Sequence, residues 1–168
     1  DLICPWCWIG KRHLDEALRQ LGDTGMDVEV DIQWRGVQLL PMLPSKGMPF
    51  ADFYLKRLGS TAAVQARQAQ VQTAARAVGL QIDFSKIPTM PNTAKAHKLL
   101  VLAEKACSPA QQDALIERLF RAHFVLGRDL GDGETLLSIA RLSGLDTQTP
   151  AERMDTTAPL LQQQPVPQ

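Results

Sequence analysis

The sequence lacks net charge, long apolar runs and abundant cysteine, and each absence excludes a class of protein. Its 18 basic and 18 acidic residues cancel, which removes the positive excess expected of a protein that binds nucleic acid or an anionic membrane. No stretch approaches the roughly 18 apolar residues of a membrane span. Three cysteines, an odd number, do not make a secreted disulfide framework. With 168 residues and 45% hydrophobic content, we expect an ordinary soluble globular protein with one core.

The N-terminus carries no readable targeting signal. The sequence begins at Asp1 with neither a start methionine nor a signal-peptide pattern, so it does not indicate the compartment. We expect a cytoplasmic rather than a periplasmic protein, and the sequence does not reveal its oligomeric state.

Two of the three cysteines stand in the segment Cys4-Pro5-Trp6-Cys7, at the head of a helical pattern. Pro5 suits the first helical position, so Cys4 is expected at the N-cap. The helix N-terminus should favour the Cys4 thiolate and lower its pKa by about one unit from the ~8.5 of a free thiol. Cys7 lies one turn inward, where we expect a less exposed sulfur. The pattern predicts redox chemistry in which Cys4 attacks and Cys7 resolves.

Two structural interpretations of this pair are weaker. As a purely structural disulfide, a bond that closes so short a loop would stabilise the fold by only about 2 kcal/mol, against roughly 3 kcal/mol for a fifteen-residue loop. As half of a zinc site it needs two further ligands, and no second C-x-x-C is present. The remaining candidate ligands are Cys107, His13, His97 and His123. We therefore predict no metal site.

The pattern along the chain predicts strand, helix, strand and then several helices. Leu2 and Ile3 are typical of a strand end, and a helix should run from Pro5 to about Leu21. Alternating apolar and polar residues from Val28 to Arg35 predict a half-buried strand. A proline-rich loop, 39–49, should follow. Further helices are expected at 50–58, at 61–78 after the cap Ser60, from the cap Asn92 to Cys107, from Ser108 through Phe120, from Asp132 to Gly144, and from Thr149 towards Leu161.

Four blocks of sequence, in this order, resemble a known family. They are DLICPWCWIGKR (1–12), WRGVQLLP (34–41), PNTAKAHKLL (91–100) and LFRAHF (119–124). The chain looks like the DsbA branch of the thioredoxin superfamily and is similar, more narrowly, to the FrnE-like, 2-hydroxychromene-2-carboxylate isomerase-related group. The resemblance implies an α/β fold, in which a thioredoxin-like core carries a large all-helical insertion over the active-site cysteines.

The resemblance also implies a division of the chain. Residues 1–38 would start the thioredoxin-like core, 39–164 would form the mainly helical insertion, and 165–168 would enter the third core strand or form a tail. The core strands would then be cut short at both ends of the sequence. In the family, a Val-Pro dipeptide with a cis peptide bond faces the cysteine pair, and Val166-Pro167 stands about where it should be. Pro167 would orient a bound peptide against Cys4; the alternative is a disordered tail.

Candidate binding residues near the pair are Pro5, Trp6 and Pro167. Trp6 and the loop from Leu39 to Pro49 would supply an apolar platform for an extended polypeptide. His97 is interpreted as a packing residue, and Cys107, at a helix C-terminus where the dipole disfavours a thiolate, as an inert thiol.

The predicted function is thiol-disulfide exchange with protein or peptide thiols and disulfides, with glutathione as a candidate substrate. The reaction requires no metal or organic cofactor. Two alternatives stay open. One is a glutathione-dependent isomerase or transferase of the chromene-carboxylate isomerase type, which places a hydroxyl residue where Cys4 stands. The other is a non-catalytic peptide- or metal-binding module. The sequence does not give the direction of electron flow.

Overall fold

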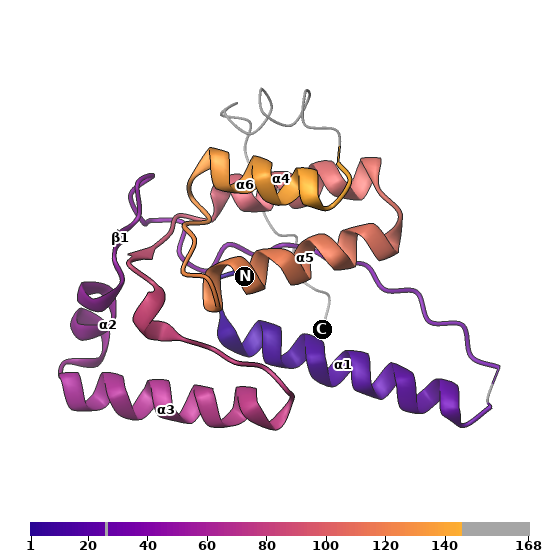
Figure 1. The fold of residues 1–168 in the computed structure, drawn as a ribbon, viewed down its shortest axis with the longest axis horizontal. Coiled ribbons are helices and arrows are strands. Elements are labelled where there is room, and N and C mark those ends of the chain that lie inside the picture. Colours follow the sequence, from indigo (N-terminus) through magenta and orange to yellow (C-terminus); the bar gives the residue numbers. More distant parts are fainter. Residues whose placement is uncertain (26, 146–168) are drawn as a thin grey trace, which may run out of the picture.

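The computed structural model describes residues 1–25 and 27–145, which form six α-helices and one short strand pair (Figure 1). The elements are α1 (Pro5–Asp23), β1 (Met48–Pro49), α2 (Phe50–Leu58), α3 (Thr61–Ala77), the 3-10 turn η1 (Phe84–Lys86), β2 (Thr89–Met90), α4 (Ala94–Ala106), α5 (Pro109–Phe124) and α6 (Gly133–Leu142). β1 and β2 are antiparallel, with Met48 opposite Met90.

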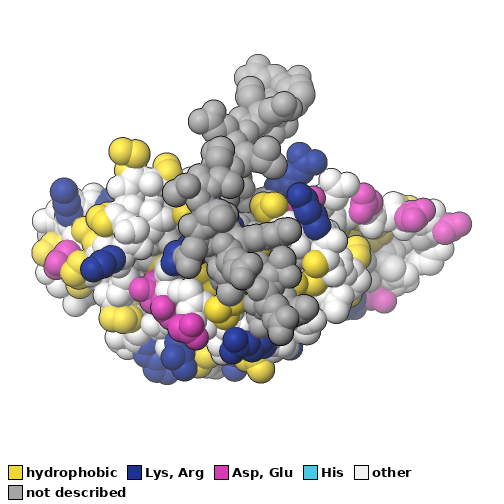
Figure 2. Space-filling model, turned by 90° about the horizontal axis from the view of Figure 1, so that it is seen from above, with side chains coloured by type: hydrophobic (Ala, Val, Ile, Leu, Met, Phe, Trp, Pro, Cys, Tyr) yellow, Lys and Arg dark blue, Asp and Glu magenta, His cyan; other side chains and the backbone are white. Residues whose placement is uncertain are grey.

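The helices lie in layers around α5. In Figure 1, α1 and α3 lie along one side of the molecule, α5 lies over α1, and α4 and α6 lie beyond α5. α2 packs against α3 near the start of α1. On the face shown in Figure 2, basic and acidic side chains are mixed over most of the surface, and acidic side chains prevail at its narrow end. None of the described helices is long and apolar enough to cross a bilayer.

Local signals place most helix starts correctly. Ser60 Oγ accepts a hydrogen bond from the Ala63 N–H at 3.2 Å, and Asp132 Oδ2 accepts one from Thr135 at 2.9 Å. Ser108 and Gln111 form the expected reciprocal capping box. The helix expected from Thr149 and the dipeptide Val166-Pro167 lie outside the described residues.

Asn92 is the exception, because Thr93 occupies the N-cap of α4. The Asn92 side chain instead ties three segments together. Its Oδ1 accepts from the Ala94 N–H at 3.0 Å and from Gln38 Nε2 at 2.9 Å, and its Nδ2 donates to the Leu43 carbonyl at 2.6 Å. Residue type predicted a polar residue at the helix start but not this bridging role.

The strand predicted from Val28 to Arg35 is wrong. Residues 27–38 form neither helix nor strand, and Val28 and Val30 are 53% and 46% exposed. A strand needs a hydrogen-bonding neighbour, and no other described segment is strand-paired with this one. Leu2 and Ile3 are buried but lie in a turn. Alternation and burial were therefore insufficient to define a strand at either position.

An aromatic stack joins α1 to α5. The indole of Trp8 lies 5.9 Å, centroid to centroid, from each of Phe120 and Phe124, and all three rings are nearly parallel. Its Nε1–H donates to Glu117 Oε2 at 3.1 Å. The buried indole therefore has both an apolar contact surface and a hydrogen-bond acceptor.

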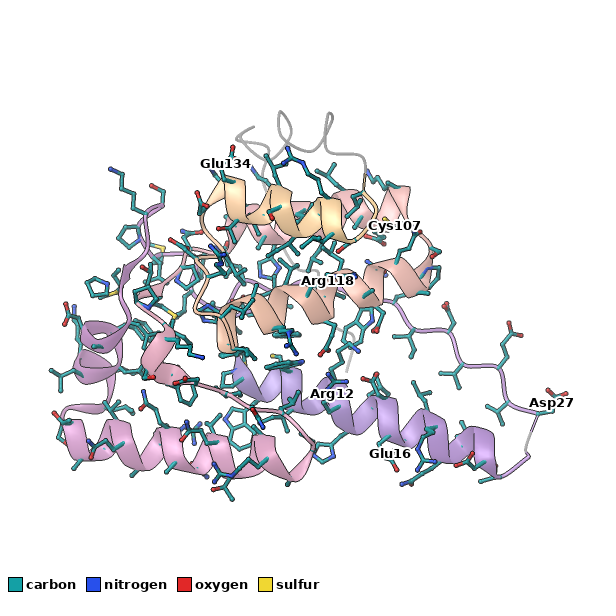
Figure 3. All side chains as sticks on the ribbon, viewed as in Figure 1. Arg12, Glu16, Asp27, Cys107, Arg118 and Glu134 are labelled. Atoms are coloured by element: carbon teal, nitrogen blue, oxygen red, sulfur yellow. The ribbon has the colours of Figure 1, made fainter. Side chains whose placement is uncertain are left out.

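A buried lysine reinforces the same contact. Lys11 is only 4% exposed, and its Nζ lies 3.0 Å from both Asp15 Oδ2 and Asp113 Oδ2. Burial opposes the charged ammonium, but hydrogen bonds and charge from the two carboxylates outweigh it and raise the pKa of Lys11. Neighbouring Arg12, labelled on α1 in Figure 3, pairs with Glu117, so two cations of α1 meet acids of α5.

We expect Lys11→Ala to destabilise the fold, because it leaves Asp113 without its buried cation and removes the packing of the lysine stem. The carboxylates are partly exposed, so the expected cost is about 1–3 kcal/mol, at the lower end for a broken buried pair. Urea unfolding measures it. The control Lys56→Ala removes an exposed lysine of α2 and should change stability by less than about 0.5 kcal/mol. Equal stability losses in the two variants would contradict the prediction.

Candidate active site at the start of helix α1

Cys4 occupies the N-cap of α1, as the sequence predicts. Its backbone is extended, with φ −96° and ψ 109°, and Pro5 follows in the first helical turn. The Cys4 carbonyl accepts the Cys7 N–H at 3.0 Å, which starts the helix. Both cysteines are free thiols one turn apart.

The exposure of the two thiols differs from the expectation. Cys7 is exposed, whereas Cys4 is half-buried and lines a pocket. The prediction that Cys7 is the less exposed of the two cysteines is therefore wrong. Sequence spacing placed Cys7 further into the helix, but the side chain of a residue in the first turn still reaches the surface.

The two thiols titrate as one coupled unit. A hydrogen bond between the thiols lowers the pKa of Cys7 to about 6. The same hydrogen bond, with burial, raises the pKa of Cys4. The pair thus binds one proton weakly and holds the other strongly. The sequence predicted the lowered pKa at Cys4; helix position alone could not show that burial and the neighbouring thiol outweigh the helix N-terminus there.

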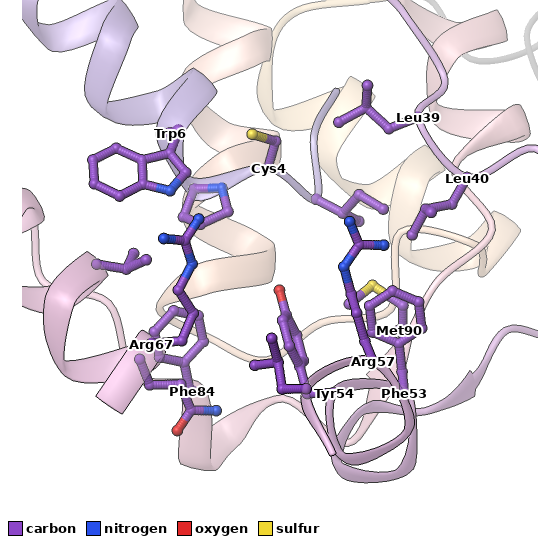
Figure 4. A pocket seen from close by; sticks show the side chains of 15 residues that line it. Cys4, Trp6, Leu39, Leu40, Phe53, Tyr54, Arg57, Arg67, Phe84 and Met90 are labelled. Atoms are coloured by element: carbon purple, nitrogen blue, oxygen red, sulfur yellow. The ribbon is translucent and has the colours of Figure 1, made fainter. Parts of the chain in front are cut away.

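A cavity of about 580 Å³ opens beside Cys4. Its walls come from the start of α1, the segment around Leu39 and Leu40, α2, α3 and the strand-pair region. The lining residues are Ile3, Cys4, Pro5, Trp6, Leu39, Leu40, Phe53, Tyr54, Arg57, Leu58, Arg67, Gln68, Val71, Phe84 and Met90. In Figure 4, Cys4 lies at one side of the cavity between Trp6 and Leu39, and Tyr54, Arg57 and Arg67 lie on the opposite side.

The structure brings several predicted residues to this cavity. Pro5 and Trp6 both line it. Of the expected platform 39–49, the part that lines the cavity is Leu39 and Leu40, whereas Met42 is 93% exposed. Pro167 lies outside the described residues.

Sequence reasoning missed the polar groups of the cavity. Arg57 comes from the last turn of α2 and Arg67 from α3, and their guanidinium groups flank the Tyr54 hydroxyl (Figure 4). Burial, with the charge of Cys4, raises the pKa of Tyr54, so its hydroxyl remains protonated. No local motif marks these residues, because they meet only when α2 and α3 pack together.

His97 organises the loop beside the site rather than lining the cavity. It is buried, and Asp1 Oδ1 lies 3.1 Å from its Nε2. Asp1 Oδ2 also accepts the Leu39 N–H at 2.7 Å, so one carboxylate holds both α4 and the loop. Burial lowers the pKa of His97 to about 4. A neutral buried ring agrees with the interpretation of His97 as a packing residue.

The other candidate ligands lie apart from the cavity. Burial raises the pKa of Cys107, which ends α4 and lies away from the start of α1 (Figure 3). His123 is fully buried and His13 is exposed. Within residues 1–25 and 27–145, no group of three or more His, Cys, Asp or Glu side chains is arranged to hold a metal ion.

Known proteins similar to this chain include a Bacillus protein and a solved structure from Streptomyces. The uncharacterized protein YwbO of Bacillus subtilis is 27% identical over 146 residues, which cover 87% of this chain and 64% of YwbO. The crystal structure of a probable DsbA oxidoreductase from Streptomyces coelicolor superposes with a TM-score of 0.80 at 25% identity, and covers 93% of this chain and 65% of that one. The chain thus spans just under two thirds of the length of each.

The family comparison covers nearly the whole sequence. The family model for the DSBA-like thioredoxin domain matches residues 1–159. Together with the solved structure, it confirms the expected fold class, a DsbA-like thioredoxin fold that is mostly helical in the described residues. The chain belongs to the DSBA-like thioredoxin domain family.

Proposed function

We propose that the protein is a thiol-disulfide oxidoreductase whose working groups are Cys4 and Cys7. The observation that carries the proposal is the pair of free thiols at the start of α1, which share a tightly held proton beside a cavity large enough for a ligand. Family membership and the similarity to a probable DsbA oxidoreductase support the same class of chemistry. The reaction as proposed needs no cofactor.

The cavity selects Cys4 as the sulfur that meets the substrate, because Cys4 lines it and Cys7 does not. Because the pair shares one proton, we assign the reactive form to the arrangement in which Cys7 holds that proton and Cys4 is the thiolate. The Cys4 thiolate then attacks a substrate disulfide, forms a mixed disulfide and releases one substrate thiolate. Cys7 loses its proton and attacks Cys4, which forms the Cys4–Cys7 bond and releases the second thiolate. The substrate gains two electrons and the pair loses two; the reverse reaction oxidises a dithiol.

Redox titration tests the function. In glutathione buffers of graded potential, we expect a reversible two-electron transition, read by tryptophan fluorescence because Trp6 and Trp8 adjoin the cysteines. Cys4→Ser should abolish the transition. If the wild-type protein shows no transition and its count of free thiols stays constant across the series, the proposal is wrong.

The roles of the two cysteines are tested by trapping. Cys7→Ser removes the resolving thiol, so a mixed disulfide on Cys4 should accumulate with bis(2-hydroxyethyl) disulfide and be detected by mass spectrometry of the unreduced protein. Cys4→Ser should accumulate much less adduct, because Cys7 does not line the cavity. The control Cys107→Ser should leave exchange unchanged. Faster adduct formation in Cys4→Ser than in Cys7→Ser would reverse the assignment.

The coupled titration predicts the pH dependence of alkylation. The pKa of Cys7 is about 6, so the thiolate of the pair forms as pH rises through 6. The rate of iodoacetamide labelling should therefore rise well below the ~8.5 of a free thiol. Cys4→Ala removes the hydrogen-bond donor to Cys7, so the midpoint for Cys7 should move upward in that variant.

Peptide mapping supplies the internal reference for this experiment. Cys107 has a raised pKa, so its labelling should rise only at higher pH. One common midpoint for Cys7 and Cys107 would contradict the coupling of the two thiols.

A further inference from the structure

We infer that the cavity beside Cys4 selects disulfides that carry carboxylates, and that Arg57 and Arg67 are the residues that recognise them. The inference rests on the proposed exchange at Cys4 and names its substrate class. Both arginines line the cavity, whereas none of its 15 lining residues is acidic. In the described part of the chain, the cavity therefore carries positive charge without a compensating carboxylate.

The two guanidinium groups are placed to act on one ligand. They approach from α2 and α3 on either side of Tyr54, and both face the side of the cavity where Cys4 lies (Figure 4). The Tyr54 hydroxyl interacts electrostatically with Cys4, Arg57 and Arg67. A ligand that joins its sulfur to Cys4 thus has two cationic groups and a protonated hydroxyl within the same cavity.

Arg67 is held in position without losing its charge. Its guanidinium carbon lies 5.7 Å from the centre of the Trp6 ring, and its Nη1 donates to Gln70 Oε1 at 2.8 Å. Neither contact neutralises the cation. Within residues 1–25 and 27–145, neither Arg67 nor Arg57 forms a salt bridge. A guanidinium in this state suits a carboxylate, which it can bind through two parallel hydrogen bonds.

The rest of the cavity suits a ligand with an aliphatic segment between its sulfur and its carboxylates. Ile3, Phe53, Val71, Phe84 and Met90 supply apolar walls. A cationic disulfide would meet two like charges and no acid, so the site should disfavour it. The shared chemistry is a disulfide with carboxylates close to sulfur, carried either by a small thiol or by an acidic peptide.

A series of small disulfides that differ in charge tests the inference. The probes are dithiodiglycolate, with two carboxylates, neutral bis(2-hydroxyethyl) disulfide, and cystamine, with two ammonium groups. Each rate with reduced protein is divided by the rate of the same probe with dithiothreitol, which removes intrinsic differences in reactivity. In the exchange, Cys4 bonds to one probe sulfur and the other sulfur leaves as a thiolate.

We expect normalised rates to fall in the order anionic, neutral, cationic. The double variant Arg57→Gln/Arg67→Gln should reduce the anionic-to-cationic ratio about tenfold, the combined effect of two partly exposed ion pairs. Arg57→Lys/Arg67→Lys keeps the charges and should retain most of the order. The control Arg118→Gln removes one exposed positive charge from α5 (Figure 3) and should leave the order unchanged.

The outcomes separate the inference from the proposed function. Exchange with all three probes at equal normalised rates, or an order unchanged in the double glutamine variant, would overturn the recognition of carboxylates but keep the oxidoreductase. No exchange with any probe would overturn the proposed function itself. Added salt should slow the anionic probe and not the neutral one.

The carrier of the carboxylates is distinguished by size. Glutathione disulfide and a disulfide of an acidic hexapeptide are compared with neutral counterparts of the same length. A preference for the acidic member in the small pair, in the peptide pair or in both supports the inference and indicates the carrier. Absence of the preference in both pairs would contradict it.

Discussion

The contact between α1 and α5 is the constraint on which the site depends. Cys4 is fixed by the start of α1, and α1 is fixed by Trp8 and Lys11 against α5. The stack with Phe120 and Phe124 supplies apolar area, while Glu117 and Asp113 satisfy the polar atoms that this burial would otherwise leave unpaired. A rotation of α1 about its axis would unpair both, so the helix that carries the thiols has one favoured orientation.

The cavity depends on a second constraint, the sharp reversal between α2 and α3. Gly59 ends α2 in the left-handed region, with φ 83°, and Ser60 caps α3 directly afterwards. Glycine adopts this conformation without the steric cost of a Cβ. Because the connection is so short, the last turn of α2 and the early turns of α3 stay adjacent, which brings Arg57 and Arg67 to one cavity.

The sequence predicted those features that local rules determine. Caps, proline positions and apolar spacing placed the helices from 50 to 144 to within a few residues. The four sequence blocks indicated the DsbA branch of the thioredoxin superfamily, which the family model confirms. Predictions that depended on a contact with a distant part of the chain succeeded less well. At residues 28–35, apolar and polar side chains alternate as they do in a strand. A strand also needs a hydrogen-bonded neighbour, and the alternation says nothing about whether one is present. For Asn92, the residue type likewise predicted a polar side chain at the helix start. It did not predict the hydrogen bonds to Gln38 and Leu43, because these residues approach Asn92 only in the folded chain.

The same distinction applies within the candidate site. The spacing of Cys4 and Cys7 indicates redox chemistry because both thiols lie in one helical turn, where local geometry is enough. Their pKa values depend on burial and on the hydrogen bond between them, which the helix N-terminus alone does not determine. In the proposed exchange, substrate choice depends on residues still further from the motif, on α2 and α3. A C-x-x-C pair therefore indicates the class of reaction. In the proposed exchange, the charge of the surrounding helices would decide which disulfide reaches Cys4.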